Sequence, residues 1–177
     1  MVAGELYRAS DAELVEARRR ARQLTARYNA TSQEDEAQRV ELMRQLFREV
    51  GDGVWIEPPF LCDYGWNITL GERVFLNFNC VVLDCAEVTI GPLTKLGPAV
   101  QLCAATHPLD PEERATGLEY AKPISIGRNA WIGAAAIVGP GVTIGDDSVI
   151  GAGSVVLGDV PPRSVAAGAP CRVLRSL

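Results

Sequence analysis

Aliphatic residues recur at every sixth position along the C-terminal half of the chain. A glycine follows each of the first five members of the series, which is Ile126, Ile132, Val138, Ile144, Ile150 and Val156. Six residues advance an α-helix by about 600°, so this period would scatter the aliphatics around a helix. In an extended chain six is a multiple of two, and the aliphatics then share one side. The pattern predicts a mainly β fold, a parallel β-helix in which each hexapeptide forms one wall and the aliphatics stack in the core.

The same period extends upstream, with two irregularities. Six further aliphatics head repeats: Leu70, Leu76, Val82, Ile90, Leu96 and Leu102. The spacing slips by two residues between Val82 and Ile90, and the register is lost after Leu102 until Ile126. An insertion must leave the wall of a solenoid, so we expect one protruding loop, residues 108–123, of the kind that commonly lines a binding face.

The first fifty residues have a different pattern, with many charges and little glycine. Ser10 and Glu13 have the spacing of a capping box, and apolar residues follow them at helical intervals. We expect a second helix from about Gln33 to Val50. The chain therefore divides, in this interpretation, into an N-terminal α-helical segment (1–53) and a β-helix with a C-terminal tail (54–177).

Composition narrows the choice of partners. The chain has 177 residues, of which 47% are hydrophobic and 22% charged, so it can bury a core. Its net charge of −5 argues against nucleic acid as a partner. No apolar run approaches the roughly 20 residues of a membrane span, and we expect no membrane partner. We interpret the three consecutive arginines 18–20 as a solvated helix face.

The cysteines and the single histidine argue against a metal site. Five cysteines without a C-x-x-C pair indicate neither a disulfide framework nor a zinc ribbon, so we expect a reduced, cytoplasmic protein. One histidine cannot supply the zinc ligands of a β-helical carbonic anhydrase. Cys80, Asp84 and Cys85 fit the repeat, where small cysteines pack well, and no metal is expected there.

His107 is the strongest candidate for chemistry. It lies where the repeat gives way to the long loop, and it is the chain's only histidine. An unperturbed imidazole titrates at about pH 6.5, so a histidine can act as a general base near neutrality. Cys103 is not expected to be a nucleophile, because no base other than His107 is available to activate it.

Several longer motifs resemble one family. "AGELYRASDAEL" is similar to an N-terminal helical segment, "CDYGWNITLG" and "LNFNCVVLD" to acceptor-side motifs, "ATHPLDPEER" to a catalytic loop, and "GAGSVVLGDVPPRSVAAGAPCRVLR" to a C-terminal signature. Together they resemble the hexapeptide-repeat sugar O-acetyltransferases, the family of maltose, galactoside and nodulation-factor acetyltransferases. The resemblance implies a left-handed β-helix, a homotrimer with active sites between subunits, acetyl-CoA as co-substrate and a sugar hydroxyl as acceptor.

The resemblance also implies roles for individual residues. His107 matches the general base, Asn77 the asparagine that orients the reacting groups, and Asp63 and Asp84 acceptor contacts. The acetyl-CoA groove is implied for Trp131, Ala134, Ala152, Leu157, Gly158, Arg172 and Arg175. Backbone N–H groups near Ala134, together with Asn77, would stabilise the developing oxyanion.

The sequence departs from the family at three places. Cys85 stands where galactoside members can carry a second acid, and Ala134 replaces a serine found in some members. Leu157-Gly158 stands where Thr-Lys is common, so Arg172 and Arg175 would carry more of the attraction to the coenzyme's phosphates. Two alternatives stay open at this point: acetylation of another small alcohol or an amine, and a non-catalytic β-helical scaffold.

Overall fold

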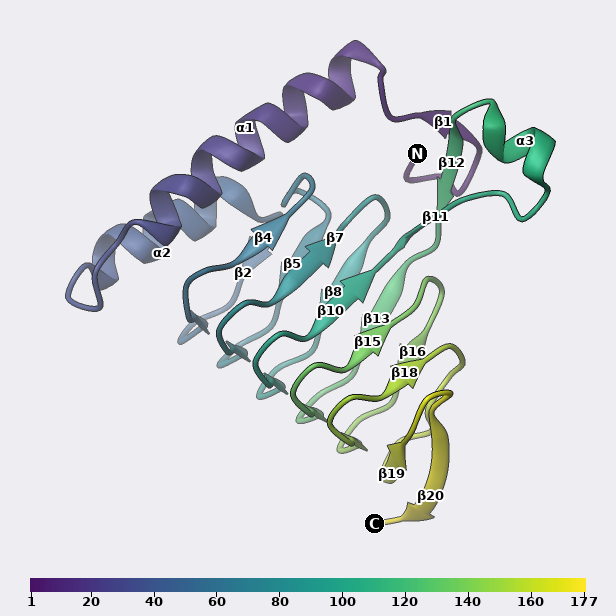
Figure 1. Ribbon diagram of the computed structural model, residues 1–177. Helices are drawn as coiled ribbons and strands as arrows, with labels where there is room; N and C mark the ends of the chain where they lie inside the picture. The colour runs from purple at the N-terminus through teal and green to yellow at the C-terminus, as the bar shows by residue number, and fades with distance from the viewer.

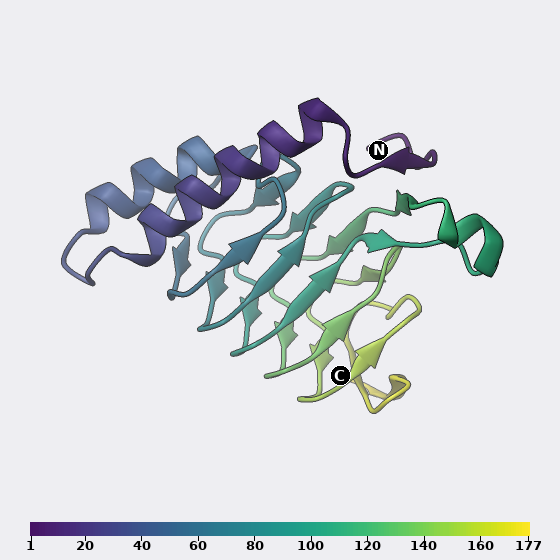
Figure 2. The same ribbon diagram turned by 45° about the horizontal axis from the view of Figure 1, so that its top comes forward.

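The protein is a left-handed parallel β-solenoid of about six turns with two helices at its N-terminal end, as a computed structural model of residues 1–177 shows (Figure 1). The helices α1 (Ala12–Asn29) and α2 (Glu36–Leu46) lie together over the first turns (Figure 2). The C-terminus lies at the opposite end of the solenoid. The fold class predicted from the repeat is confirmed.

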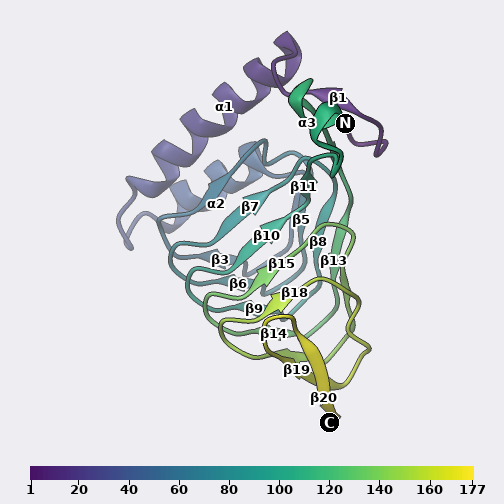
Figure 3. The ribbon, with the colours of Figure 1, turned by 45° about the vertical axis from the view of Figure 1, so that its right-hand side comes forward.

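Three parallel sheets form the walls of a triangular prism, and the chain visits them in rotation (Figure 3). The first contains β2 (Glu49–Val50), β5 (Ile68–Leu70), β8 (Val88–Ile90), β13 (Ile124–Ile126) and β16 (Thr143–Ile144). The second contains β3 (Trp55–Ile56), β6 (Phe75–Leu76), β9 (Lys95–Leu96), β14 (Trp131–Ile132), β17 (Val149–Ile150) and β19 (Ser164–Ala167), with β20 (Arg172–Ser176) added antiparallel. The third contains β4 (Leu61–Cys62), β7 (Val81–Leu83), β10 (Gln101–Cys103), β15 (Ile137–Val138) and β18 (Val155–Val156).

The aliphatic series forms the core by stacking from turn to turn. Ile126 pairs with Ile90 on one side and Ile144 on the other, and all three are fully buried. Paired residues are 18 apart in the later turns but 20 apart in the first turns, as in Val82 and Leu102. The two extra residues fall after strands of the third sheet, so the slip read from the sequence marks longer turns at one corner.

The glycine that follows each aliphatic allows the turns to stack closely. A Cβ added to Gly145 would lie 2.4 Å from the backbone nitrogen of Pro162 in the next turn. These glycines do not have positive φ; the left-handed conformation falls two residues later, for example at Asn129 and Asp147. The repeated glycine is therefore explained by close backbone approach and not by a need for positive φ.

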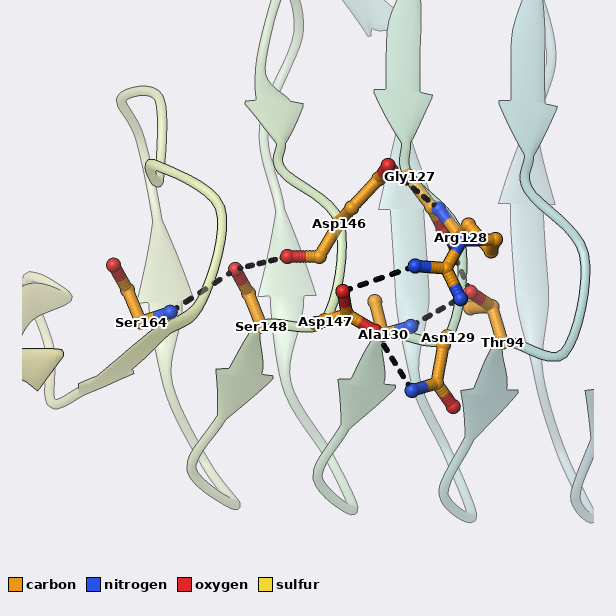
Figure 4. A network of polar contacts seen from close by, with 9 residues as sticks. All are labelled: Thr94, Gly127, Arg128, Asn129, Ala130, Asp146, Asp147, Ser148 and Ser164. Carbon is orange, nitrogen blue, oxygen red and sulfur yellow. Dashed lines mark hydrogen bonds and ion pairs between the residues drawn. The ribbon is translucent and has the colours of Figure 1, made fainter. Parts of the chain in front are cut away.

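Polar side chains link the turns at the corner between the first and second sheets (Figure 4). The buried Thr94 hydroxyl donates to the carbonyl of Gly127 at 2.7 Å and accepts from the N–H of Ala130 at 2.9 Å. One turn further, the Asp146 carboxylate accepts from the N–H of Arg128 at 2.7 Å. These bonds satisfy backbone groups that leave the strand ladders at the corners.

The N-terminal helices close the open end of the core. The buried Tyr28 donates its hydroxyl to the carbonyl of Ile56 at 2.6 Å, and the rings of Phe47 and Phe60 make an edge-on contact. Without this cover the first turn would expose its apolar interior to water.

Two details of the predicted helices are wrong. The first helix begins at Ala12 after Asp11, with no side-chain cap, so Ser10 and Glu13 form no capping box. The second ends at Leu46, and Val50 lies in β2, paired with Leu70, because the first turn of the solenoid starts there. The boundary at residue 53 stays a prediction, and β2 lies before it.

The predicted loop protrudes, but it has secondary structure of its own (Figure 1). It contains helix α3 (Pro111–Ala115) and strand β12 (Leu118–Ala121). Strand β12 pairs antiparallel with β11 (Ala105–Thr106) and with β1 (Tyr7–Arg8). The N-terminus of the chain is thereby fixed beside the loop that carries His107.

Candidate active site

The predicted site residues lie mainly at two different corners of the prism. Turns that follow the third sheet, including residues 63–67, 84–87, 104–123 and 157–159, stack at what we call the His107 corner. Turns that follow the second sheet, including residues 77–80, 97–100, 133–136 and 151–154, stack at what we call the Asn77 corner. No cavity of the single chain is lined by both His107 and Asn77.

His107 follows β11 directly, and its side chain is exposed. The chain on either side of it is held in place: Thr106 pairs with Tyr120, and the Arg114 guanidinium donates to the carbonyls of Pro108 and Leu109 at 3.2 and 2.9 Å. The imidazole itself makes no hydrogen bond within the chain. The imidazole is therefore free to bind a ligand, while the backbone that carries it is held in place.

A cavity of about 390 Å³ lies at the His107 corner. We call it the corner cavity, and its walls are Ala9, Arg18, Arg22, Asp63, Tyr64, Leu83, Cys85, Ala105 and Glu119. The predicted residue Asp63 is among them. The two arginines and the glutamate were not predicted. The four-residue spacing of the arginines on α1 was a usable signal, because it places both on one helix face.

Arg18 lines the corner cavity, which corrects the interpretation of the arginine run at this residue, whereas Arg19 and Arg20 are exposed as expected. Its guanidinium donates to the hydroxyl of Tyr64 at 2.7 Å and to the carbonyl of Ala9 at 2.5 Å, and it lies over the Tyr64 ring at 5.7 Å. Helix α1 is thereby fixed to the wall of the corner cavity.

Two acidic residues of the cavity are held by neighbouring donors. The Cys85 thiol donates to the Asp63 carboxylate at 3.4 Å, and the Tyr7 hydroxyl donates to the Glu119 carboxylate at 3.1 Å. Burial raises the pKa of Cys85 to about 12, so the thiol keeps its proton and remains a donor. Burial also raises the pKa of Asp63, although the Cys85 hydrogen bond and the charges of Arg18 and Arg22 oppose that rise.

Asp84 does not line the cavity, contrary to the expected acceptor contact. Its side chain is 0% exposed, and its carboxylate accepts from the backbone N–H groups of Asp63, Tyr64 and Asn67 at 3.1, 2.8 and 3.3 Å. A carboxylate enclosed in this way has no surface to offer a substrate. It supports the turn that carries Asp63 and Tyr64.

Asn77 lies at the other corner, directly after β6, and is half-buried. Its side-chain oxygen accepts from the N–H of Phe78 at 2.8 Å, which leaves the amide N–H₂ as a free donor. Ala134 and Ala152 lie on the same corner in successive turns, linked by the bond from the N–H of Gly153 to the Ala134 carbonyl at 2.8 Å. The N–H of Ala134 has no partner within the chain.

The remaining residues of the implied coenzyme groove are spread over exposed surface. Gly158 and Arg172 share the wall of a second cavity, of about 220 Å³, beside the terminal hairpin β19–β20. Trp131, on β14, and Leu157 are 59% and 67% exposed. Arg175 is exposed on β20. The structure thus groups Gly158 and its neighbour Leu157 with Arg172, and it places Trp131 and Arg175 in register on the second sheet, through Val149 and Val165.

Three further observations concern metal binding, the cysteines and membrane spans. No three histidine, cysteine or acidic side chains cluster into a candidate metal site. All five cysteines are free thiols. Neither of the longer helices is apolar enough over a sufficient length to cross a membrane.

Comparisons with known proteins agree with the fold. A maltose acetyltransferase hexapeptide capping motif matches residues 1–51, and a bacterial transferase hexapeptide motif of six repeats matches residues 123–158. Nodulation protein L of Rhizobium meliloti is 50% identical over 173 residues, which are 98% of this chain and 94% of that protein.

Two solved structures superpose over nearly the whole chain. A maltose O-acetyltransferase from Clostridium difficile gives a TM-score of 0.98 at 44% identity, covering 99% of this chain and 94% of that one. A hexapeptide-repeat acetyltransferase from Vibrio cholerae, solved with acetyl coenzyme A, gives 0.94 at 41% identity, covering 100% and 96%.

The capped β-solenoid and the solved structures that superpose on it place the chain in the class of hexapeptide-repeat acyltransferases. This chain belongs, within that class, to the sugar O-acetyltransferase family of the maltose, galactoside and nodulation-factor type. The resemblance read from the motifs is therefore confirmed, and the chain is an O-acetyltransferase.

Proposed function

We propose that this enzyme transfers the acetyl group of acetyl-CoA to a hydroxyl of a sugar, at sites between the subunits of a homotrimer. The observation that carries the proposal is the division of the site residues. His107 and Asn77 occupy different corners of a rigid prism, and a second copy of the chain can present its Asn77 corner to the His107 corner of the first. Closed three-fold symmetry would form three identical sites.

His107 acts as the general base in this proposal. An imidazole nitrogen removes the proton of the attacking hydroxyl and later returns it to the departing thiolate, so no covalent enzyme intermediate is required. Such proton transfer contributes typically about 10²–10⁴-fold to the rate. The exposed imidazole, on a backbone that the β11–β12 pairing and the Arg114 bonds hold on either side, supports this role.

The Asn77 corner supplies donors for the negative charge that develops on the thioester carbonyl oxygen. The N–H of Ala134 is unpaired, and the Asn77 amide has its N–H₂ free because its oxygen is bonded to Phe78. Fixed donors of this kind stabilise a developing oxyanion without reorganisation. Ala134 contributes through its backbone, so the missing serine hydroxyl does not remove this contact.

The corner cavity is the proposed site of the acceptor. Its carboxylates, Asp63 and Glu119, can accept hydrogen bonds from sugar hydroxyls, and Arg18 and Arg22 can donate to them. Leu83, Ala105 and the ring of Tyr64 supply apolar surface for a sugar face. The volume of about 390 Å³ is in the usual range for small-molecule sites.

The residues present fit a coenzyme A groove. Trp131 and Leu157 offer exposed apolar surface, Ala152 leaves the groove open at its turn, and Arg172 and Arg175 offer cations for phosphate. When bound, acetyl-CoA supplies the activated acetyl group. We place the enzyme in the cytoplasm, in keeping with its five free thiols.

A thiol-release assay tests the function. The protein is mixed with acetyl-CoA and a panel of mono- and disaccharides, and coenzyme A is measured with a thiol reagent. We expect release that depends on one or more of the sugars and is absent from His107→Ala. Release with an amine or a simple alcohol but with no sugar would replace the acceptor class. No release with any acceptor would favour the scaffold alternative.

A further inference from the structure

Asp84 is an ionisable residue buried without a counter-ion. Its side chain is 0% exposed, and it takes part in no salt bridge. An isolated buried carboxylate is unfavourable unless hydrogen bonds replace its lost water. Those bonds come from three backbone N–H groups of a single turn, residues 63–67. In return, the Asn67 side chain donates to the Asp84 carbonyl at 2.7 Å.

The turn at residues 63–67 depends on these bonds. It is one of the longer turns of the His107 corner, so its backbone leaves the strand ladder, and the N–H groups of Asp63, Tyr64 and Asn67 have no carbonyl partner. Gly65 within it has a φ of +77°, and a Cβ there would lie 2.5 Å from the Leu46 side chain. The turn therefore packs against the end of helix α2 and is held by the hydrogen bonds to the Asp84 carboxylate.

Two side chains of this turn are walls of the corner cavity. Asp63 faces the cavity and receives the Cys85 thiol bond, and Tyr64 receives the Arg18 bond. Both residues donate their backbone N–H to the same oxygen of Asp84. A displacement at Asp84 would therefore move both side chains together.

We propose that Asp84 is a positioning residue for acceptor binding: its three backbone hydrogen bonds fix Asp63 and Tyr64 in the geometry that contacts the acceptor. The inference rests on the proposed function, since it takes the corner cavity as the acceptor site. Asp84 then acts on the acceptor indirectly, through Asp63 and Tyr64, and not by the direct contact expected from the sequence.

The charge state of Asp84 gives this role a pH dependence. Burial raises the pKa of Asp84 to about 6, against the opposing effect of the backbone hydrogen bonds. The titratable groups around it are Cys62, Asp63 and Cys85, and no cation is among them. A protonated carboxyl has one oxygen converted to a donor, which cannot accept from an N–H. Acceptor binding therefore weakens as the pH falls through about 6.

This loss of binding is distinct from unfolding. The folded pKa of Asp84 lies above its ordinary value of 3.8, so the folded protein takes up this proton more readily than the unfolded chain. By linkage, protonation of this group between about pH 6 and pH 4 adds to the free energy of unfolding. Protonation of Asp84 therefore lowers the affinity for the acceptor, while the same protonation raises the free energy of unfolding.

The first test is the variant Asp84→Asn, which keeps the shape of the side chain. One oxygen still accepts from Asp63 and Tyr64, whereas the amide N–H₂ faces the N–H of Asn67, donor against donor. We expect the KM for the sugar to rise about tenfold or more, the cost of one charge-assisted bond, with the KM for acetyl-CoA unchanged.

Ser148→Ala is the matched control, because Ser148 is equally buried and its hydroxyl also forms hydrogen bonds with the backbone of a turn, at another corner. It should lower the melting temperature and leave both KM values unchanged.

The second test separates the Asp84 titration from catalysis. His107→Ala contains no histidine, so sugar binding measured on it by calorimetry between pH 5 and 7.5 reports no imidazole. The sugar used is the one with the highest kcat/KM in the panel. We expect affinity to fall below about pH 6 in His107→Ala and to lose that step when Asp84→Asn is added. A flat pH profile in His107→Ala, or an unchanged sugar KM in a folded Asp84→Asn, would overturn the inference. Absence of acetyl transfer by the native enzyme would instead overturn the proposed function.

Discussion

Asn77 directly follows β6 of the second sheet, whereas His107 follows β11, in the segment that leaves the prism after β10 of the third sheet, so the two residues lie at different corners of one prism. If each active site combines His107 of one subunit with Asn77 of its neighbour, two inactive variants should complement each other. Equal amounts of His107→Ala and Asn77→Ala, refolded together, should recover about a quarter of native activity, because one interface in four receives both native residues. The activity is measured by thiol release.

The control for complementation is the same mixture assembled from subunits that were folded separately and not exchanged. It should show only the sum of the two low activities. A refolded mixture no more active than that control would mean that both residues act within one chain, and the intersubunit site would be abandoned.

The oligomeric state can be measured directly. A closed trimer of this 19.0 kDa chain should sediment at about 57 kDa at micromolar concentration. The proposed site needs a second copy because His107 and Asn77 lie at different corners of one prism, and closed three-fold symmetry would complete one site for each copy. A monomer that nevertheless transferred acetyl groups would contradict that requirement.

His107→Ala should lower kcat by about two to four orders of magnitude, with a modest change in the KM for acetyl-CoA, because a general base acts in the transition state. Asn77→Ala should also lower kcat. The double variant should lose less than the product of the two separate factors, since both residues act on one transition state. Steady-state kinetics on the purified proteins checks this, and a His107→Ala enzyme with most of its sugar-dependent activity would require another base.

The repeat predicted the architecture well because a solenoid encodes its geometry locally. Every sixth aliphatic residue marks one buried rung, and the pairing of Ile126 with Ile144 follows from three such steps. The two-residue slip after Val82 was also visible in the sequence, but the sequence did not show what the extra residues do. It lengthens the turn that holds Asp84, and only the three-dimensional arrangement shows that this turn borders a cavity.

The errors arose where tertiary contacts override a local pattern. Val50 continues a helical spacing in the sequence, but it pairs with Leu70 because the first turn of the solenoid needs a strand there. Arg18 looks solvated in a run of three arginines, and its bond to Tyr64 depends on where α1 crosses the prism. Asp84 shares an acidic motif with its family, yet its burial follows from a turn more than fifteen residues earlier in the chain.

Ile144→Asp should severely destabilise the protein. Ile144 is 0% exposed, stacked between Ile126 and Val160, and a buried unpaired carboxylate there should cost about 3–5 kcal/mol or prevent folding. Ser125→Asp is the matched control, because it adds the same charge to the exposed face of the neighbouring strand, and it should change stability by less than about 0.5 kcal/mol. Urea or thermal unfolding measures both. Native-like melting of Ile144→Asp would show that the inward register is wrong.

Gly158 and Arg172 share one cavity beside the terminal hairpin, and this arrangement allows the proposed coenzyme site to be tested by substitution at both positions. If the proposed groove is correct, Arg172→Ala should raise the KM for acetyl-CoA by about fivefold, since Arg172 and Arg175 are then the cations left to attract the coenzyme's phosphates. Gly158→Lys should lower that KM by a similar factor and restore affinity in the Arg172→Ala background. The backbone accepts the change, because a Cβ at Gly158 meets no atom within 4 Å.

Salt distinguishes this electrostatic effect from a change in shape. The KM for acetyl-CoA of Gly158→Lys should rise more steeply between low and physiological ionic strength than that of the native enzyme, and Arg172→Ala should show the shallowest rise. Arg27→Ala, which removes an equally exposed cation from helix α1, should leave the KM and its salt dependence unchanged. If Gly158→Lys and Arg172→Ala both behaved like Arg27→Ala, the cavity beside the hairpin would not hold the coenzyme's phosphates, and the groove would have to be placed along Trp131 and Ala152 alone.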